Sequence, residues 1–290
     1  MKLSARPYLA LAFVIAAGMP LVVFWSWPYT RILNSELAAA REQNLLMAEN
    51  VATSLEEYYK DVSVAFLAFR HSIVLNKGAD ALPIFEDLHF RHICVAEEKT
   101  GKVLVDYMVE KSPCPEIVPP QRLELFSRLA DEGDLSISPT FVPNGGQARF
   151  FLATRLDNLL VIGAIHTDYV VALQQQIKFG DRGHAVIVDQ LGYAIAHPFQ
   201  GQDDPPIDMS EIAAFQSLQV GEKGVGTFYS PFMGEKMIVG FAQVPGPGWG
   251  VLIPQPLSEL ENYASGFNRD AYFVLSLGGM FSLTIAMVLS

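Results

Sequence analysis

The chain has 290 residues with a formal net charge of −11, and half of its residues are hydrophobic. The acidic balance argues against a nucleic-acid-binding protein, because such proteins gather Lys and Arg to neutralise phosphates. The length is sufficient for two domains of modest size.

Two apolar segments without any charged residue, 8–28 and 272–290, lie near the ends of the chain. A helix needs about 20 apolar residues to cross a bilayer, so both segments predict transmembrane helices. Lys2 and Arg6 precede the first segment, which predicts a cytoplasmic N-terminus and places region 30–270 in the periplasm or outside the cell. The expected location is therefore the inner (cytoplasmic) membrane, crossed twice. A cleaved signal peptide is the alternative for the first segment, although no small-residue cleavage site follows it.

A long amphipathic helix is predicted for residues 29–77. Apolar residues recur there every three or four positions, which is typical of one helix face. Five apolar residues on this face have no obvious partner near the membrane, and exposed apolar stripes usually mark an interface. We therefore expect a parallel homodimer. These residues are Leu33, Leu37, Met47, Val51 and Leu55.

The remaining sequence repeats one order of elements in two regions, 78–178 and 179–256. Each region has two strand-like runs around a Gly turn, then a helix, then three further strand-like runs. Strands joined by short turns form antiparallel sheets with helices on their faces. The predicted fold class is α+β, with two tandem modules on the long N-terminal helix. Residues 257–271 are expected to form a helix that connects to the second apolar segment, which is truncated at Ser290.

Cys94 and Cys114 are the two cysteines, and both fall in the part expected outside the cytoplasm. A disulfide is permitted in that environment. In the chain-entropy model, closing this loop would contribute about 3 kcal/mol to stability. Two unpaired thiols are the alternative, because spacing alone does not establish a bond.

The sequence GHAVIVDQLGYAIAHP at Gly183–Pro198 resembles the first hairpin of the membrane-proximal module of double Cache sensor domains. The segment Gly224–Pro256 is similar to the Gly-rich strand, hairpin and Gly-Trp strand that follow in that family. The resemblance implies two PAS-like modules, the membrane-distal one at 78–178 and the membrane-proximal one at 179–256. It also implies a sensor of a chemoreceptor, a histidine kinase or a diguanylate cyclase.

The function implied by this resemblance is extracytoplasmic sensing of a small ligand and transmembrane signalling. The ligand usually binds the distal module, and an output domain would lie beyond residue 290. The alternative is a membrane-anchored module that binds a partner protein without a small ligand. The amino-acid-binding members carry an Arg-x-Trp-Tyr motif and a late Asp, whereas this chain has Trp only at 25, 27 and 249 and reads Gly-Ala-Ile-His at 163–166. We therefore do not expect an α-amino acid ligand.

Five residues of the distal module are candidates for ligand binding. Arg149 and Phe151 share one face of a predicted strand, and an Arg there could form a bidentate contact with a carboxylate. His166 ends an apolar strand, Tyr107 offers a ring and a hydroxyl group, and Arg91 adds positive charge. A small anionic or polar ligand is expected, a carboxylate rather than an amine. The alternative is that the arginines are solvated and that His166 satisfies the start of the next helix.

No catalytic motif, phosphate-binding loop or metal-ligand pattern occurs, so no catalytic residue, cofactor or metal is expected in these residues. The group His89, His92 and Cys94 is a weak metal motif, because alternation places His89 on the opposite strand face. Asp189 and His197 lie at a turn and at a strand end, where they are expected to have structural roles.

Overall fold

The computed structural model describes residues 28–74, 82–110, 113–131, 135–142, 148–201 and 205–266, with five single positions after them. The two predicted transmembrane helices lie almost entirely outside the described residues. Within the described part, no helix combines the length and the apolar character that crossing a bilayer requires.

Helix α2 spans Pro28–Val74 and is 47 residues long, close to the predicted range 29–77. It has no proline after its first residue to interrupt the backbone hydrogen bonds. Its buried side chains recur at helical spacing, so one continuous stripe faces the core. The stripe includes Ala48, Val51, Ala52, Leu55, Tyr58, Val62, Phe66 and Phe69.

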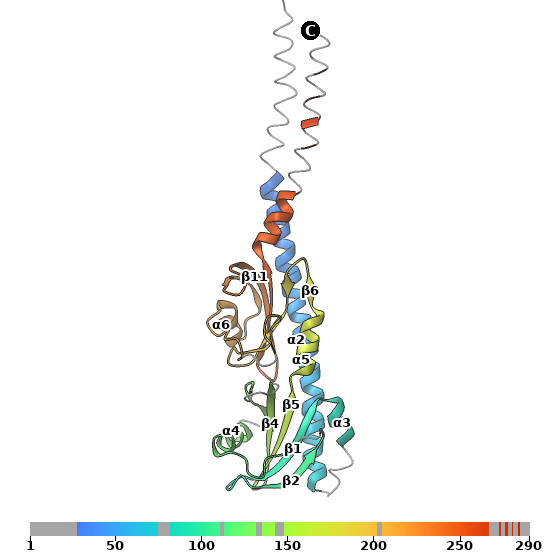
Figure 1. Ribbon diagram of the computed structural model, residues 1–290, viewed down its shortest axis with the longest axis vertical. Helices are drawn as coiled ribbons and strands as arrows, with labels where there is room; N and C mark the ends of the chain where they lie inside the picture. The colour runs from blue at the N-terminus through green and yellow to red at the C-terminus, as the bar shows by residue number, and fades with distance from the viewer. Residues whose placement is uncertain are drawn as a thin grey trace, which may run out of the picture. The chain divides into compact units, whose positions relative to one another are not determined.

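The first sheet has five strands in the order β2-β1-β5-β4-β3. Its strands are β1 (Phe90–Glu97), β2 (Val103–Met108), β3 (Ser136–Ile137), β4 (Arg149–Leu156) and β5 (Leu159–His166). Helices α3 (Leu82–Asp87) and α4 (Pro120–Asp131) complete the module. Helix α2 covers one face of the sheet, and α4 covers the other (Figure 1).

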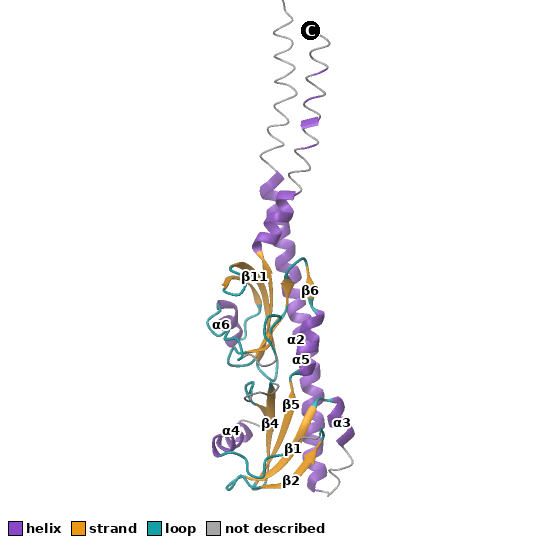
Figure 2. Cartoon of the chain, in the orientation of Figure 1, coloured by secondary structure: helices purple, strands orange, loops and turns teal. Residues whose placement is uncertain are grey.

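The second sheet has the strand order β10-β11-β12-β8-β9. Its strands are β8 (Val186–Val188), β9 (Ala194–Ala196), β10 (Gly224–Ser230), β11 (Glu235–Val244) and β12 (Trp249–Pro256), and α6 (Ala213–Gln219) packs on it. Each sheet begins with a hairpin whose first strand pairs with the last strand of the same sheet, so the two orders are the same. The structure thus shows the predicted repeat, with the helices and strands distinguished in Figure 2.

Helix α5 (Asp168–Gln176) follows β5 in the chain. After it, β6 (Lys178–Phe179) and β7 (Gly183–His184) pair as a small two-stranded sheet. Thr167 occupies the N-cap position of α5, but its side chain makes no capping hydrogen bond. Its hydroxyl group instead donates to the carbonyl of Ala148 over 3.4 Å.

The chain divides into two compact units, and the larger one, 43–228 with 237–255, contains the first sheet and most of the second. One apolar cluster inside this unit joins α2 to strands of each sheet. Phe150 of β4 and Trp249 of β12 are in ring contact there, with centroids 4.9 Å apart. The two modules therefore share a core along α2, and each also has a cluster of its own, under α4 in the first and under α6 in the second.

This shared core corrects the surface proposed for dimer formation. Val51 is 6% exposed and Leu55 is 0% exposed, and Met47 packs against the same cluster. The prediction of an unpartnered stripe was wrong at these positions, because the chain's own core covers them. Leu33 and Leu37, the other two residues of the predicted stripe, are half-buried and lie outside this cluster.

Candidate functional site

The candidate site lies on the α4-covered face of the first sheet, where strand alternation gathers polar side chains. Arg149 of β4 pairs in register with His166 of β5, and Phe151 pairs with Ala164. On the other side of β5, His92 of β1 also pairs with Ala164. Because directly paired residues share a face, Arg149, Phe151, His166 and His92 all project toward the α4 side.

Arg91 reaches this region through an irregularity in β1. The register of β1 against β5 shifts between Phe90 and His92, and Arg91 is the residue left between them. Such a bulge redirects side chains locally. The Arg91 carbonyl accepts hydrogen bonds from the backbone N–H groups of Val109 and Glu110, at 3.3 and 2.9 Å.

Three arginines act on one another at this site, and we call Arg91, Arg122 and Arg149 the arginine cluster. Burial lowers the pKa of the Arg149 guanidinium, and the positive charges of Arg91 and Arg122 lower it further. Arg122 comes from α4, and its guanidinium carbon lies 4.2 Å from the ring centroid of Phe141 and 5.8 Å from that of Phe151. Stacking on aromatic faces holds this guanidinium over the sheet.

The arginine cluster lacks a counter-charge within the described residues, where no carboxylate forms a salt bridge with any of its members. The Nε atoms of Arg91 and Arg149 are buried without a hydrogen-bond partner among these residues. The three side chains themselves are half-buried, and a partly desolvated cation is costly unless it is paired. The arrangement therefore favours an anion with several acceptor oxygens.

Glu110 brings a carboxylate to this region by pairing with His166. The Nε2 atom of His166 lies 3.1 Å from a carboxylate oxygen of Glu110, while its Nδ1 atom is buried without a partner among the described residues. Glu110 itself is exposed. This pair places a carboxylate at the end of β5, where His166 is in register with Arg149.

Of the five predicted site residues, the structure brings together Arg149, Phe151, His166 and Arg91 but not Tyr107. Tyr107 pairs with Ile93, which faces the α2 side. Its ring packs edge-on against Phe69 of α2 with centroids 5.0 Å apart. Its ring thus belongs to the core, on the face opposite the arginine cluster.

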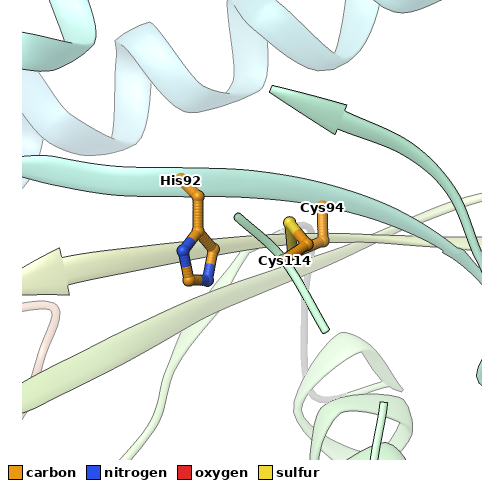
Figure 3. Close-up of side chains that lie close together, drawn as sticks. All are labelled: His92, Cys94 and Cys114. Atoms are coloured by element: carbon orange, nitrogen blue, oxygen red, sulfur yellow. A yellow bond between two sulfur atoms is a disulfide. The ribbon is translucent and has the colours of Figure 1, made fainter. Parts of the chain in front are cut away.

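Cys94 and Cys114 form a disulfide on the α4-covered side, with Cα atoms 6.0 Å apart. His92 projects from the same strand as Cys94 and lies beside the sulfurs (Figure 3). Because the two sulfurs are bonded to each other, neither offers the thiolate that a metal would need. His89, the remaining member of the weak metal motif, has a left-handed backbone (φ 63°) just before β1.

Arg122 was missing from the site predicted by sequence. A usable signal existed, because Arg122 precedes Phe126 by four positions and Leu129 by seven on the amphipathic helix, which places all three on neighbouring parts of one face. That signal places Arg122 on the inner face of α4 but does not show which strand the helix packs against. The contact of Arg122 with β4 joins residues far apart in the sequence, and strand periodicity carries no information about it.

Asp189 has the structural role that its turn position predicted. One carboxylate oxygen accepts from the N–H groups of Leu191 and Tyr193, at 2.9 and 3.0 Å. The other accepts from the N–H of Thr140, at 2.9 Å, and so joins the second hairpin to the first module.

A family model for the Cache domain matches residues 30–263. No curated protein is similar enough in sequence to match. The ligand-binding domain of the Pseudomonas aeruginosa amino acid chemoreceptor PctC, solved with GABA, is 18% identical with a TM-score of 0.53, over 72% of this chain and 96% of that one.

Two further solved structures share the fold. The periplasmic sensory domain of the Campylobacter jejuni chemoreceptor Tlp1 is 10% identical with a TM-score of 0.59, over 78% of this chain and 98% of that one. The extracellular domain of the putative histidine kinase rpHK1S-Z16 is 17% identical with a TM-score of 0.60, over 76% and 95%.

Proposed function

Because the chain belongs to the double Cache family of sensor domains, we propose that it detects a small anionic ligand at the arginine cluster of its first sheet. The single observation that carries this proposal is the group of three arginines without a carboxylate partner among the described residues. An anion would supply the missing counter-charge. The sensor would perform no chemistry on it.

The geometry favours a carboxylate over an amine. A guanidinium presents paired N–H donors that match the two oxygens of a carboxylate. A hydrogen bond to a charged group contributes about 1.5–3 kcal/mol, which corresponds to roughly 10- to 150-fold in affinity. An ammonium group would meet three like charges and only one nearby carboxylate, that of Glu110.

The ligands of two similar structures carry both groups. PctC was solved with GABA and a Pseudomonas fluorescens chemoreceptor, CtaA, with L-isoleucine, and each ligand has a carboxylate and an ammonium group. The carboxylate is the part that an arginine can bind. This chain has Ala164 and His166 where the strand β5 faces the site. Neither side chain supplies a negative charge for an α-ammonium group, so we infer an organic acid and not an α-amino acid.

We also propose how ligand binding is transmitted across the membrane. The sensor would lie outside the cytoplasm between two transmembrane helices, as a parallel homodimer with an output domain beyond residue 290. Ligand binding would shift the population of two sensor conformations and so displace the membrane helices. Cysteines placed along α2 would map the dimer by cross-linking, and Val51→Cys should stay unlinked because Val51 is buried in its own chain.

Ligand binding is best tested by isothermal titration of the 290-residue chain with malonate, succinate and acetate, and with putrescine and ethylamine as cationic probes. We expect at least one acid to bind. Arg149→Ala and Arg122→Ala should each weaken that acid at least about tenfold, because each removes a charged hydrogen-bond donor.

Arg128→Ala is the matched control, because Arg128 lies on α4 as Arg122 does but is exposed. Its acid affinity should match that of the unaltered chain. Binding of amines alone, or acid binding that survives Arg149→Ala and Arg122→Ala, would refute the assignment. Failure of every small probe would favour the partner-protein alternative.

A further inference from the structure

A cavity of about 500 Å³ lies between helix α5 and the segment 195–201 that contains the end of strand β9. None of the arginine cluster lines it, and all of its lining residues belong to the larger compact unit. Binding sites for small molecules usually measure about 300–1,000 Å³. The cavity therefore has the size of a ligand site and is distinct from the anion site.

The buried polar groups of this cavity are uncharged. Thr167, Gln174 and His197 line it and are each buried. Burial, together with the smaller effect of neighbouring His184, lowers the pKa of His197 to about 4, so the imidazole is neutral at physiological pH. Val171 and Ile195 supply apolar wall between these groups.

The charged lining residues, Asp168 and Lys178, are both exposed and belong to the rim. Asp168 is the first residue of α5, and Lys178 lies in β6, after that helix has ended. Their opposite charges cancel, so the lining residues carry no net charge.

Two lining side chains have defined hydrogen-bonding roles. Within the part of the chain that the structure describes, the Oε1 atom of Gln200 is buried without a partner, which leaves an acceptor that needs a donor. The Nδ1 atom of His197 lies 3.2 Å from the backbone N–H of Phe199 and accepts from it, so the neutral ring carries its proton on Nε2. The cavity therefore contains an unused acceptor and a ring with a fixed tautomer.

We propose that this cavity is a second binding site, which takes a small uncharged molecule bearing hydroxyl or amide N–H groups. A donor of the ligand would satisfy Gln200, and the apolar wall would contact its carbon skeleton. The inference is independent of the anion site, because the two share no residue.

The position of the cavity gives such a ligand a route to influence signalling. Gln174 of α5 donates from its side-chain amide to the carbonyl of Ala185, just before β8, over 3.0 Å. A molecule in the cavity would contact α5 and the end of β9 together. It would add a second tie between the helix that follows the first sheet and the hairpin that begins the second.

The test is a thermal-shift titration of the 290-residue chain in a detergent without a sugar headgroup, so that the detergent does not compete. The neutral probes are glucose, myo-inositol and propionamide, and the charged probes are malonate and ethylamine. We expect a saturable rise of Tm with at least one neutral probe. Gln200→Leu should raise the Kd of that probe at least about tenfold, because it removes the acceptor.

Two control variants should leave the Kd of the neutral probe unchanged. Gln216→Leu makes the same substitution on the exposed face of α6. Arg149→Ala alters the anion site and so distinguishes the two sites. If Gln200→Leu folds poorly, Val171→Phe fills the cavity and should abolish the shift. The proposal is overturned if no neutral probe raises Tm at about 10 mM. A shift that survives Gln200→Leu or Val171→Phe overturns it equally.

Discussion

Gly240 is the position where strand β11 approaches helix α2 most closely, and Gly240→Ala should destabilise the chain severely. A Cβ atom at this position would lie 2.3 Å from the Asn44 carbonyl carbon, 2.4 Å from the Asn44 oxygen and 2.5 Å from the Leu45 nitrogen. All three are backbone atoms of α2, so no side-chain rotation relieves the clash. The strand and the helix must separate.

The cost follows from these distances. Ordinary contacts begin at 3.4 Å, so the strand and helix would have to move apart by roughly 1 Å. Overpacking a core by one methyl group costs about 1–3 kcal/mol. Because three backbone atoms are involved, we expect the top of that range, about 3 kcal/mol. For a chain of this size that lowers Tm by about 6–12 °C.

The measurement is differential scanning calorimetry of the 290-residue chain, with Gly226→Ala as the control. Gly226 lies in β10, and its added Cβ would meet Phe241 and Val239 at 3.8 and 4.0 Å, which are ordinary contacts. The control should change stability by less than about 1 kcal/mol. Equal Tm values for the two variants would contradict the close packing of β11 on α2 at Gly240.

Three further predictions concern the disulfide, pH and a buried amide. Reducing the Cys94–Cys114 bond, which closes a separation of 20 residues, should cost about 3 kcal/mol in urea unfolding, and an unchanged midpoint would contradict this. The pKa of His197 is about 4 in the folded chain, whereas its ordinary value is 6.5. Between pH 4 and pH 6.5 the unfolded chain therefore binds a proton at this imidazole that the folded chain does not bind. Stability should therefore be full above pH 6.5 and fall by about 2 kcal/mol or less toward pH 4, allowing for solvent screening, and His197→Asn should flatten this slope. Asn44 is 0% exposed, and neither of its side-chain polar atoms has a partner among the described residues, so Asn44→Ala should leave stability unchanged or raise it by about 1 kcal/mol. A loss of more than about 1 kcal/mol would contradict this.

Local periodicity predicted most elements because their signals are confined to single segments. The strand Leu159–His166 and the helix α2 follow directly from apolar spacing. The first of the three later strand-like runs in region 78–178 is predicted over residues 135–142 but forms only Ser136–Ile137, because Pro139 has no N–H to continue the ladder.

The part of the site that could be predicted is the part that depends on alternation within a single strand. Alternation placed Arg149 and Phe151 on one face, and the structure agrees. The face of Tyr107 depends on its register with β1, and the position of Arg91 depends on a register shift, so neither follows from the strand itself. Arg122 joins the cluster through packing of α4 on the sheet, which no local pattern contains.

The shared helix α2 also fixes the rotational phase between the two modules. Asn44 and Tyr59 meet glycines of the second module, Gly240 and Gly246, whereas Phe66 meets Gly163 of the first. One residue inserted between Tyr59 and Phe66 would turn these contact sets by about 100° relative to each other, while an insertion of seven would turn them by only about 20°. Relatives of this sensor can therefore exchange modules only when the helix between the two contact sets keeps its length or changes it by nearly whole turns.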